Sequence, residues 1–144
     1  MGSQSPLGLP AESGPLANRK VLVVDDEEDV RTFLATLFED AGAEVLQAED
    51  GDEAIRIASA ERPDMITLDL SMPGKDGIQT FVELRSAEAT RAIPVCIVTG
   101  HPEFRKVIYD REVPPPEGYL AKPVDEDKLV SYMAHILEHG AHAN

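Results

Sequence analysis

Five side chains that could bind a metal ion or a phosphoryl group stand at the ends of short apolar segments. Asp25 and Asp26 follow the first segment, and Asp69, Thr99 and Lys122 stand at the ends of three later ones. Carboxylates about 4 Å apart repel by about 1 kcal/mol in water and by more in a protein, so a group of three requires a cation. Mg²⁺ suits such a group because it takes oxygen ligands and uses only one or two carboxylates plus phosphate oxygens. The set therefore predicts phosphoryl transfer.

The nucleophile of this site is predicted to be a carboxylate. No cysteine or histidine ends one of the apolar segments, and aspartyl phosphate is a known covalent form of this chemistry. The metal ion and Lys122 would neutralise the phosphoryl oxygens, and the Thr99 hydroxyl would bind one of them by a hydrogen bond.

Parallel β-strands are the elements that must bring these side chains together. Nearly continuous apolar runs are typical of strands covered on both faces, and they alternate here with helical periodicity. Because connections between parallel strands are right-handed, the alternation predicts an α/β fold with a doubly wound parallel sheet. Ligands of such sheets bind outside the carboxyl ends of the strands. The predicted strands cover residues 20–24, 44–48, 64–68, 93–98 and 118–121.

Helices are predicted between the strands from apolar residues spaced three and four apart. The clearest stripes start at Val30 and at Leu129, and Gly42 is a plausible C-terminal cap for the first of them. Between Thr99 and Gly118 the helical signal is weak, and three consecutive prolines at 114–116 must end it. The fourth helix is therefore predicted to be short or irregular.

Length and charge indicate one acidic domain. The chain has 144 residues, a net charge of -14 and one cysteine, which excludes an internal disulfide. The negative field makes nucleic acid and membrane surfaces poor partners. No apolar run reaches the length of a membrane span, so we expect a cytoplasmic protein. Residues 1–18 are predicted to be a disordered tail, 19–140 the folded domain and 141–144 a C-terminal tail.

Four sequence strings resemble the receiver domain of bacterial two-component response regulators, the CheY-like family. They are Val-Leu-Val-Val-Asp-Asp-Glu-Glu at 21–28, Leu-Asp-Leu-Ser-Met-Pro-Gly-Lys-Asp-Gly at 68–77, Val-Thr-Gly at 98–100 and Tyr-Leu-Ala-Lys-Pro at 119–123. The resemblance covers about residues 19–139 in the expected order. It implies a flavodoxin-like sheet with helices on both faces and the strand order 2-1-3-4-5.

The resemblance also implies a role for each residue of the site. Asp69 would accept the phosphoryl group. Asp26, Asp69 and the carbonyl of Ser71 would bind Mg²⁺ or Mn²⁺, with Asp25 acting through water. Lys122 would pair with the phosphoryl group, and Thr99 and Tyr119 would form the switch. Pro123 follows the lysine, often through a cis bond, and Ser71 and His101 occupy positions that influence how long the phosphoryl group lasts.

The implied partners are a sensor histidine kinase or a histidine phosphotransfer protein, and a downstream protein. The downstream protein would bind the face formed by the fourth helix, the fifth strand and the fifth helix, although the proline-rich turn before Tyr119 departs from the family pattern. The domain would be no enzyme beyond self-catalysed phosphorylation and dephosphorylation. With no output domain after it, the chain is expected to be a stand-alone regulator acting by protein contact, and a receiver cut from a larger protein is the alternative.

Three other readings compete with this one. A haloacid-dehalogenase-type phosphatase needs Asp-x-Asp on the first strand, whereas Asp25 and Asp26 are adjacent. A flavodoxin-like nucleotide-binding module needs a phosphate loop where this chain has an acidic run. A pseudo-receiver that works without phosphorylation needs a broken site, and no expected residue is missing.

His135 and His139 have zinc-binding spacing but no clear further ligand, and Cys96 is predicted to be an inert core thiol.

Overall fold

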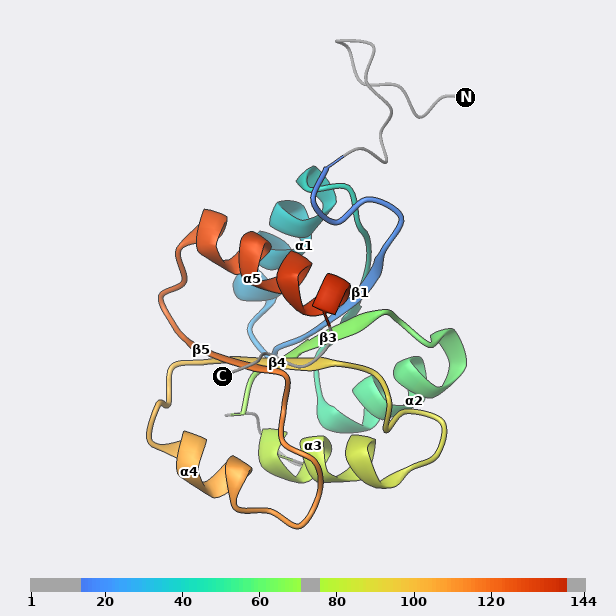
Figure 1. The fold of residues 1–144 in the computed structure, drawn as a ribbon, viewed down its shortest axis with the longest axis vertical. Coiled ribbons are helices and arrows are strands. Elements are labelled where there is room, and N and C mark those ends of the chain that lie inside the picture. Colours follow the sequence, from blue (N-terminus) through green and yellow to red (C-terminus); the bar gives the residue numbers. More distant parts are fainter. Residues whose placement is uncertain (1–13, 71–75, 140–144) are drawn as a thin grey trace, which may run out of the picture.

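The computed structural model describes residues 14–70 and 76–139, which form one parallel sheet between two layers of helices (Figure 1). The strand order is β2-β1-β3-β4-β5, as the resemblance implied. All neighbouring strands pair in parallel, and Val24 of β1 lies opposite Leu68 of β3 in the register. The strands are β1 (Lys20–Val24), β2 (Glu44–Ala48), β3 (Met65–Leu68), β4 (Val95–Thr99) and β5 (Gly118–Ala121).

In the part of the chain that the structure describes, five helices cover the two faces of this sheet. Helices α1 and α5 lie on one face, and α2, α3 and α4 lie on the other. Helix α4 has only 6 residues, so the prediction of a short fourth helix is confirmed. The helices are α1 (Glu28–Asp40), α2 (Gly51–Glu61), α3 (Gly77–Ser86), α4 (Phe104–Tyr109) and α5 (Glu126–His139).

The alternation of side chains along the central strands creates two cores. In β1, Val21 and Val23 point into the core shared with α1 and α5, whereas Leu22 and Val24 point into the core shared with α2, α3 and α4. All four are buried, because successive side chains of a strand point to opposite faces. This rigid double core fixes the strand ends that carry the candidate site.

Two strands begin later than their apolar patterns predicted. Strand β3 begins at Met65 rather than at residue 64, because the Asp64 carboxylate accepts a hydrogen bond from the Lys20 backbone N–H at 2.8 Å. Strand β4 begins at Val95 and ends at Thr99, since Pro94 lacks the N–H that a ladder needs. The helical patterns were right in kind, and Gly42 follows α1 with a positive φ of 105°, as a C-terminal cap residue does.

The segment 14–18 packs onto the domain and differs from the disordered tail predicted there. The Leu16 side chain is 0% exposed and belongs to the core between α1 and α5. Its backbone N–H donates to the Ala41 carbonyl at 2.8 Å. One leucine in a Gly/Pro-rich stretch has no periodicity, so the pattern could not reveal this contact.

Cys96 lies fully buried inside β4, as expected of an inert core thiol. Burial, with a smaller effect of the Glu117 charge, raises the pKa of the Cys96 thiol to about 12. The reactive thiolate is therefore not formed at neutral pH. Among the described residues, no helix is both long and apolar enough to span a membrane.

Candidate functional site

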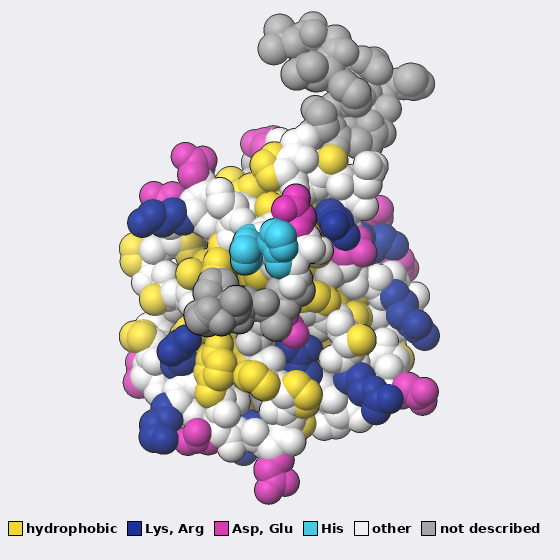
Figure 2. Space-filling view, viewed as in Figure 1, with side chains coloured by type: hydrophobic (Ala, Val, Ile, Leu, Met, Phe, Trp, Pro, Cys, Tyr) yellow, Lys and Arg dark blue, Asp and Glu magenta, His cyan; other side chains and the backbone are white. Residues whose placement is uncertain are grey.

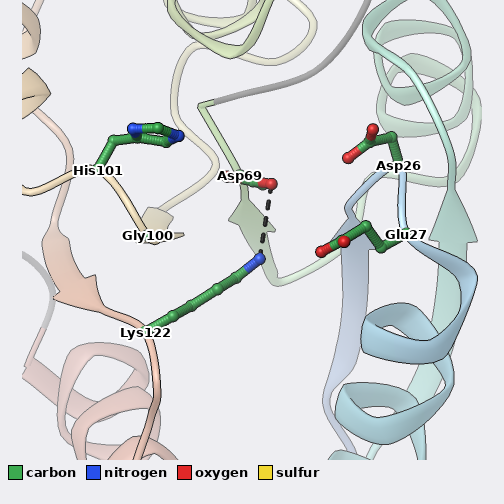
Figure 3. A pocket seen from close by; sticks show the side chains of 6 residues that line it. All are labelled: Asp26, Glu27, Asp69, Gly100, His101 and Lys122. Atoms are coloured by element: carbon green, nitrogen blue, oxygen red, sulfur yellow. Dashed lines mark ion pairs between the residues drawn. The ribbon is translucent and has the colours of Figure 1, made fainter.

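An acidic cleft opens at the carboxyl ends of β1 and β3 (Figure 3). One carboxylate oxygen from each of Asp25, Asp26 and Asp69 lies within 4.8 Å of the others. The cleft has a volume of about 320 Å³ and is lined by Asp26, Glu27, Asp69, Gly100, His101 and Lys122. The structure thus brings together the carboxylates that the sequence placed at separate strand ends.

Asp25 is the buried and fully bonded member of the acidic group. One of its carboxylate oxygens accepts from the Glu27 backbone N–H at 3.0 Å, and the other accepts from the Lys122 ammonium at 2.8 Å. Its carbonyl accepts from the Arg31 guanidinium at 2.9 Å, which fastens the turn between β1 and α1. Asp26, in contrast, is exposed to solvent on the cleft wall. The two neighbouring aspartates therefore have different environments.

Lys122 reaches between Asp25 and Asp69 from the end of β5. Its ammonium lies 3.6 Å from the Asp69 carboxylate, the ion pair drawn in Figure 3. Burial alone would lower the pKa of Lys122, but the hydrogen bond that it donates to Asp25 and the charges of Asp69 and Asp25 outweigh burial, so the pKa rises. Lys122 therefore stays charged at neutral pH and can pair with an anion on Asp69.

Thr99 and Tyr119 both contact the backbone of His101. The Thr99 hydroxyl, on a residue with 0% exposure, accepts from the His101 N–H at 3.3 Å. The Tyr119 hydroxyl donates to the His101 carbonyl at 2.7 Å. Burial first, and then the Glu103 charge, raise the pKa of Tyr119, which keeps this hydroxyl protonated as a donor. The two predicted switch residues are thus joined through one peptide segment.

Gly77 allows the start of α3 to approach the end of β3. A Cβ at Gly77 would overlap the Asp69 carbonyl oxygen and the Leu70 Cα, and the Gly77 N–H donates to the Leu70 carbonyl at 3.0 Å. We expect Gly77→Ala to lower the free energy of unfolding by about 1–3 kcal/mol, as overpacking does. Urea denaturation measures this loss. A Gly100→Ala variant is the control, because nothing lies within 4 Å of a Cβ there; equal stability of the two variants would contradict the steric explanation.

Two residues of the site were not predicted as functional from the sequence. Glu27 lines the cleft, and Arg31 fastens the turn that carries Asp25. Arg31 lies two residues after the acidic run 25–29, which is the only signal the sequence offered. His101, whose position the resemblance had marked, also lines the cleft. Ser71, the predicted carbonyl ligand, lies outside the described residues. The cis peptide bond expected before Pro123 is present.

The donor set fits a small hard divalent cation. It offers carboxylate oxygens within 4.8 Å of one another, beside an open cleft in which water and phosphate oxygens could complete the coordination. Mg²⁺ is bound in this way, by one or two carboxylates with several waters retained. Softer metals prefer sulfur or imidazole ligands, which Asp25, Asp26 and Asp69 do not offer.

The strand order of this α/β sheet and the acidic side chains at its carboxyl edge can be compared with those of known proteins. The protein family described as "Response regulator receiver domain" matches this chain over residues 21–134. Protein PilH of Pseudomonas aeruginosa is 34% identical over 118 residues, which cover 82% of this chain and 97% of PilH. The alkaline phosphatase synthesis transcriptional regulatory protein PhoP of Bacillus subtilis is 41% identical over 120 residues, which cover 83% of this chain and 49% of PhoP.

Solved structures of related proteins also match the fold of this chain. The chemotaxis protein CheY4 of Vibrio cholerae superimposes with a TM-score of 0.73 at 29% identity, covering 82% of this chain and 98% of that chain. A putative response regulator from Chloroflexus aurantiacus superimposes with a TM-score of 0.76 at 28% identity, covering 84% and 98%. The chain belongs to the response regulator receiver domain family. This is a family of signalling domains rather than classical enzymes, whose members bind Mg²⁺ at an acidic pocket and interact with histidine kinases or phosphotransfer proteins and with downstream targets.

Proposed function

We propose that Asp69 accepts a phosphoryl group from a phosphohistidine of a sensor histidine kinase or phosphotransfer protein. The observation that carries the proposal is the Asp69 carboxylate, 5% exposed, which lies beside the Lys122 ammonium and two further aspartates at the end of β3. Such burial is unfavourable for a charge unless it is paired or used. The domain would catalyse its own phosphorylation and dephosphorylation, in the cytoplasm where such kinases present their phosphohistidines.

In this proposal Asp26 and Asp69 hold Mg²⁺ directly, and Asp25 acts through water. The ion, when bound, neutralises charge on the phosphoryl oxygens. Lys122 moves from Asp69 to pair with one phosphoryl oxygen. It can do so without taking up a proton, because its raised pKa keeps the ammonium charged. The Thr99 hydroxyl turns toward the phosphoryl group and gives up its contact with the His101 N–H. Tyr119 responds because it shares the His101 segment with Thr99.

The output would pass to a protein that binds the face formed by α4, β5 and α5. Figure 2 shows hydrophobic side chains exposed on this face between groups of lysines and arginines. Val107 and Tyr109 of α4 are 41% and 37% exposed. The Arg105 guanidinium lies 4.9 Å from the Tyr109 ring centre and 5.9 Å from the Tyr119 ring centre. A shift of Tyr119 would therefore alter this surface directly.

Intact mass after incubation with acetyl phosphate and Mg²⁺ tests the proposal. We expect one added phosphoryl group on the wild type and none on Asp69→Asn or in the presence of a chelator. Asp127→Asn, at an exposed aspartate on α5, is the matched control and should be modified like the wild type. No adduct on the wild type would instead support the competing function, a pseudo-receiver that binds partners without phosphorylation.

A further inference from the structure

We propose that the last turn of α5 binds a divalent transition-metal ion such as Zn²⁺. The ligands are the imidazoles of His135 and His139 and the carboxylate of Glu138, in the string His-Ile-Leu-Glu-His at 135–139. Helix α5 has 14 residues, and at 1.5 Å per residue its end lies about 20 Å from its first turn, which follows the carboxyl edge of the sheet. The inference is therefore separate from the acidic cleft and does not depend on phosphorylation of Asp69.

The three side chains lie on one side of α5, because residues three and four apart are neighbours on a helix surface. The ring centres of His135 and His139 are 4.6 Å apart. A carboxylate oxygen of Glu138 lies 3.8 Å from Nε2 of His139. Two atoms bound tetrahedrally to one Zn²⁺ at about 2.0–2.1 Å are about 3.3 Å from each other, so this pair has to approach by only about 0.5 Å. Glu138 thus supplies the further ligand that the histidine spacing alone left open.

Exposure allows the three side chains to gather around an ion. His139 and Glu138 have side chains that are 61% and 68% exposed, and His135 is exposed as well. Figure 2 shows histidine side chains open to solvent, next to an acidic side chain. Within residues 14–70 and 76–139, three ligand atoms lie within 4.8 Å of one another only at the acidic cleft. Binding at α5 therefore includes rotation of a side chain, which exposed residues undergo within nanoseconds.

Charge and donor type determine the kind of ion. His139 is the last residue of α5, and the carbonyl groups at the end of a helix carry partial negative charge that favours a cation. The net charge of -14 adds to this attraction. Two imidazoles and one carboxylate select Zn²⁺, Ni²⁺ or Cu²⁺, whereas Mg²⁺ and Ca²⁺ prefer oxygen ligands alone.

The proposed ligand set leaves one position of a tetrahedral ion open. Two histidines and one glutamate are a known Zn²⁺ set, in which water occupies the fourth position. Helix α5 is part of the face that we propose for the downstream protein. A side chain of that protein would be able to replace the water, so the ion would add a coordination bond to the contact.

Titration of the full chain with Zn²⁺ tests the inference. The ring nitrogen signals of the four histidines are followed by NMR in excess Mg²⁺, which occupies the acidic cleft, and each signal is assigned from its His→Gln variant. We expect the His135 and His139 signals to shift together while the His101 signal stays in place. His135→Gln, His139→Gln and Glu138→Gln should each weaken binding at least about tenfold, since even residues that only support a metal ligand contribute 10–100-fold.

Two matched variants control for binding elsewhere. Glu126→Gln, at an exposed glutamate in the first turn of α5, and His142→Gln, outside the described residues, should bind Zn²⁺ like the wild type. A wild-type dissociation constant above about 1 mM, an affinity of only about 4 kcal/mol, would show that the two rings merely stack and would overturn the inference. A shift of the His101 signal at the same Zn²⁺ concentration, or binding that is lost in His142→Gln but kept in His135→Gln, would place the ion elsewhere and overturn it too. Unchanged affinity in Glu138→Gln would overturn the role of Glu138 as a ligand.

Discussion

Replacing Arg85 with alanine should lower the free energy of unfolding by about 3–5 kcal/mol, the usual effect of removing one partner of a buried ion pair. The Arg85 side chain is 2% exposed and pairs with Glu117, which precedes β5. Its guanidinium also donates to the carbonyls of Pro114 at 3.1 Å, Pro115 at 2.9 Å and Ile93 at 2.9 Å. These hydrogen bonds connect α3 with the proline-rich turn and with the residue before Pro94.

The reason for so large an effect lies in the prolines. Pro114, Pro115 and Pro116 have no N–H, so this turn cannot be held by its own backbone donors. The planar fork of Arg85 supplies the missing donors from outside and ties the turn to α3 and to the start of β4. The Glu117 carboxylate meanwhile accepts from the Val95 N–H at 2.8 Å. Loss of Arg85 would leave this carboxylate without its cation, and the carbonyls of Ile93, Pro114 and Pro115 without the donor that Arg85 provides.

Urea denaturation of the wild type and four variants would measure the effect. Arg85→Lys keeps the charge but cannot reproduce the planar fork, so it should lie between the wild type and Arg85→Ala. Glu117→Gln provides a second route to the same pair if Arg85→Ala fails to fold. Arg91→Ala, at an exposed arginine, should stay within about 0.5 kcal/mol of the wild type. A loss of less than about 1 kcal/mol for Arg85→Ala would show that the turn is held by other contacts.

Arg85 also shows where sequence reasoning stops. On α3 it lies four residues after Phe81, on the buried face of the helix, and its partners lie between 6 and 32 residues away. Neither the period of the helix nor the turn signal of the prolines indicates that the two meet. The residues of the candidate site, in contrast, could be predicted to lie together. Asp25, Asp69 and Lys122 follow parallel strands, and the carboxyl ends of such strands share one edge of a sheet.

The first and last residues of the strands also show which features the apolar pattern predicts and which depend on packing. Strands β1, β2 and β5 have the predicted bounds, because their apolar runs end at charged residues or glycine. The burial of Leu16 and the hydrogen bond between His101 and Glu103 could not be predicted, since each depends on how one side chain is turned. Sequence periodicity determines which face of an element is buried, whereas hydrogen-bond partners depend on the packed structure.

Without Mg²⁺, the variant Asp26→Asn should be more stable than the wild type, and with Mg²⁺ it should be less stable. The Asp26 carboxylate lies within 4.8 Å of two others, and at that distance in water each pair repels by about 1 kcal/mol. Lys122, the cation that lines the cleft, is already bound to Asp25. Removing the exposed charge therefore relieves repulsion of about 0.5–1 kcal/mol, after discounting for solvent screening.

Saturation with Mg²⁺ should reverse the order of stability. A ligand at 100 times its dissociation constant stabilises the folded state by about 2.7 kcal/mol, and Asp26→Asn removes one of the two carboxylates proposed to hold the ion directly. Urea denaturation with chelator and with saturating Mg²⁺ measures both states. Asp127→Asn should show the full Mg²⁺ effect of the wild type, and an equal Mg²⁺ effect in Asp26→Asn would refute the role of Asp26 as a ligand.

Asp25→Asn makes the contrast sharper, because it removes the same charge from a different environment. Asp25 is 1% exposed and accepts from Lys122 and from the Glu27 N–H. Its replacement leaves the Lys122 ammonium without its closest partner, so this variant should be less stable than the wild type even without Mg²⁺. In chelator, the change in the free energy of unfolding should therefore have opposite signs for Asp25→Asn and Asp26→Asn. That result would show that Asp25 stabilises the empty site through its hydrogen bonds, whereas Asp26 destabilises the empty site and contributes by binding the ion.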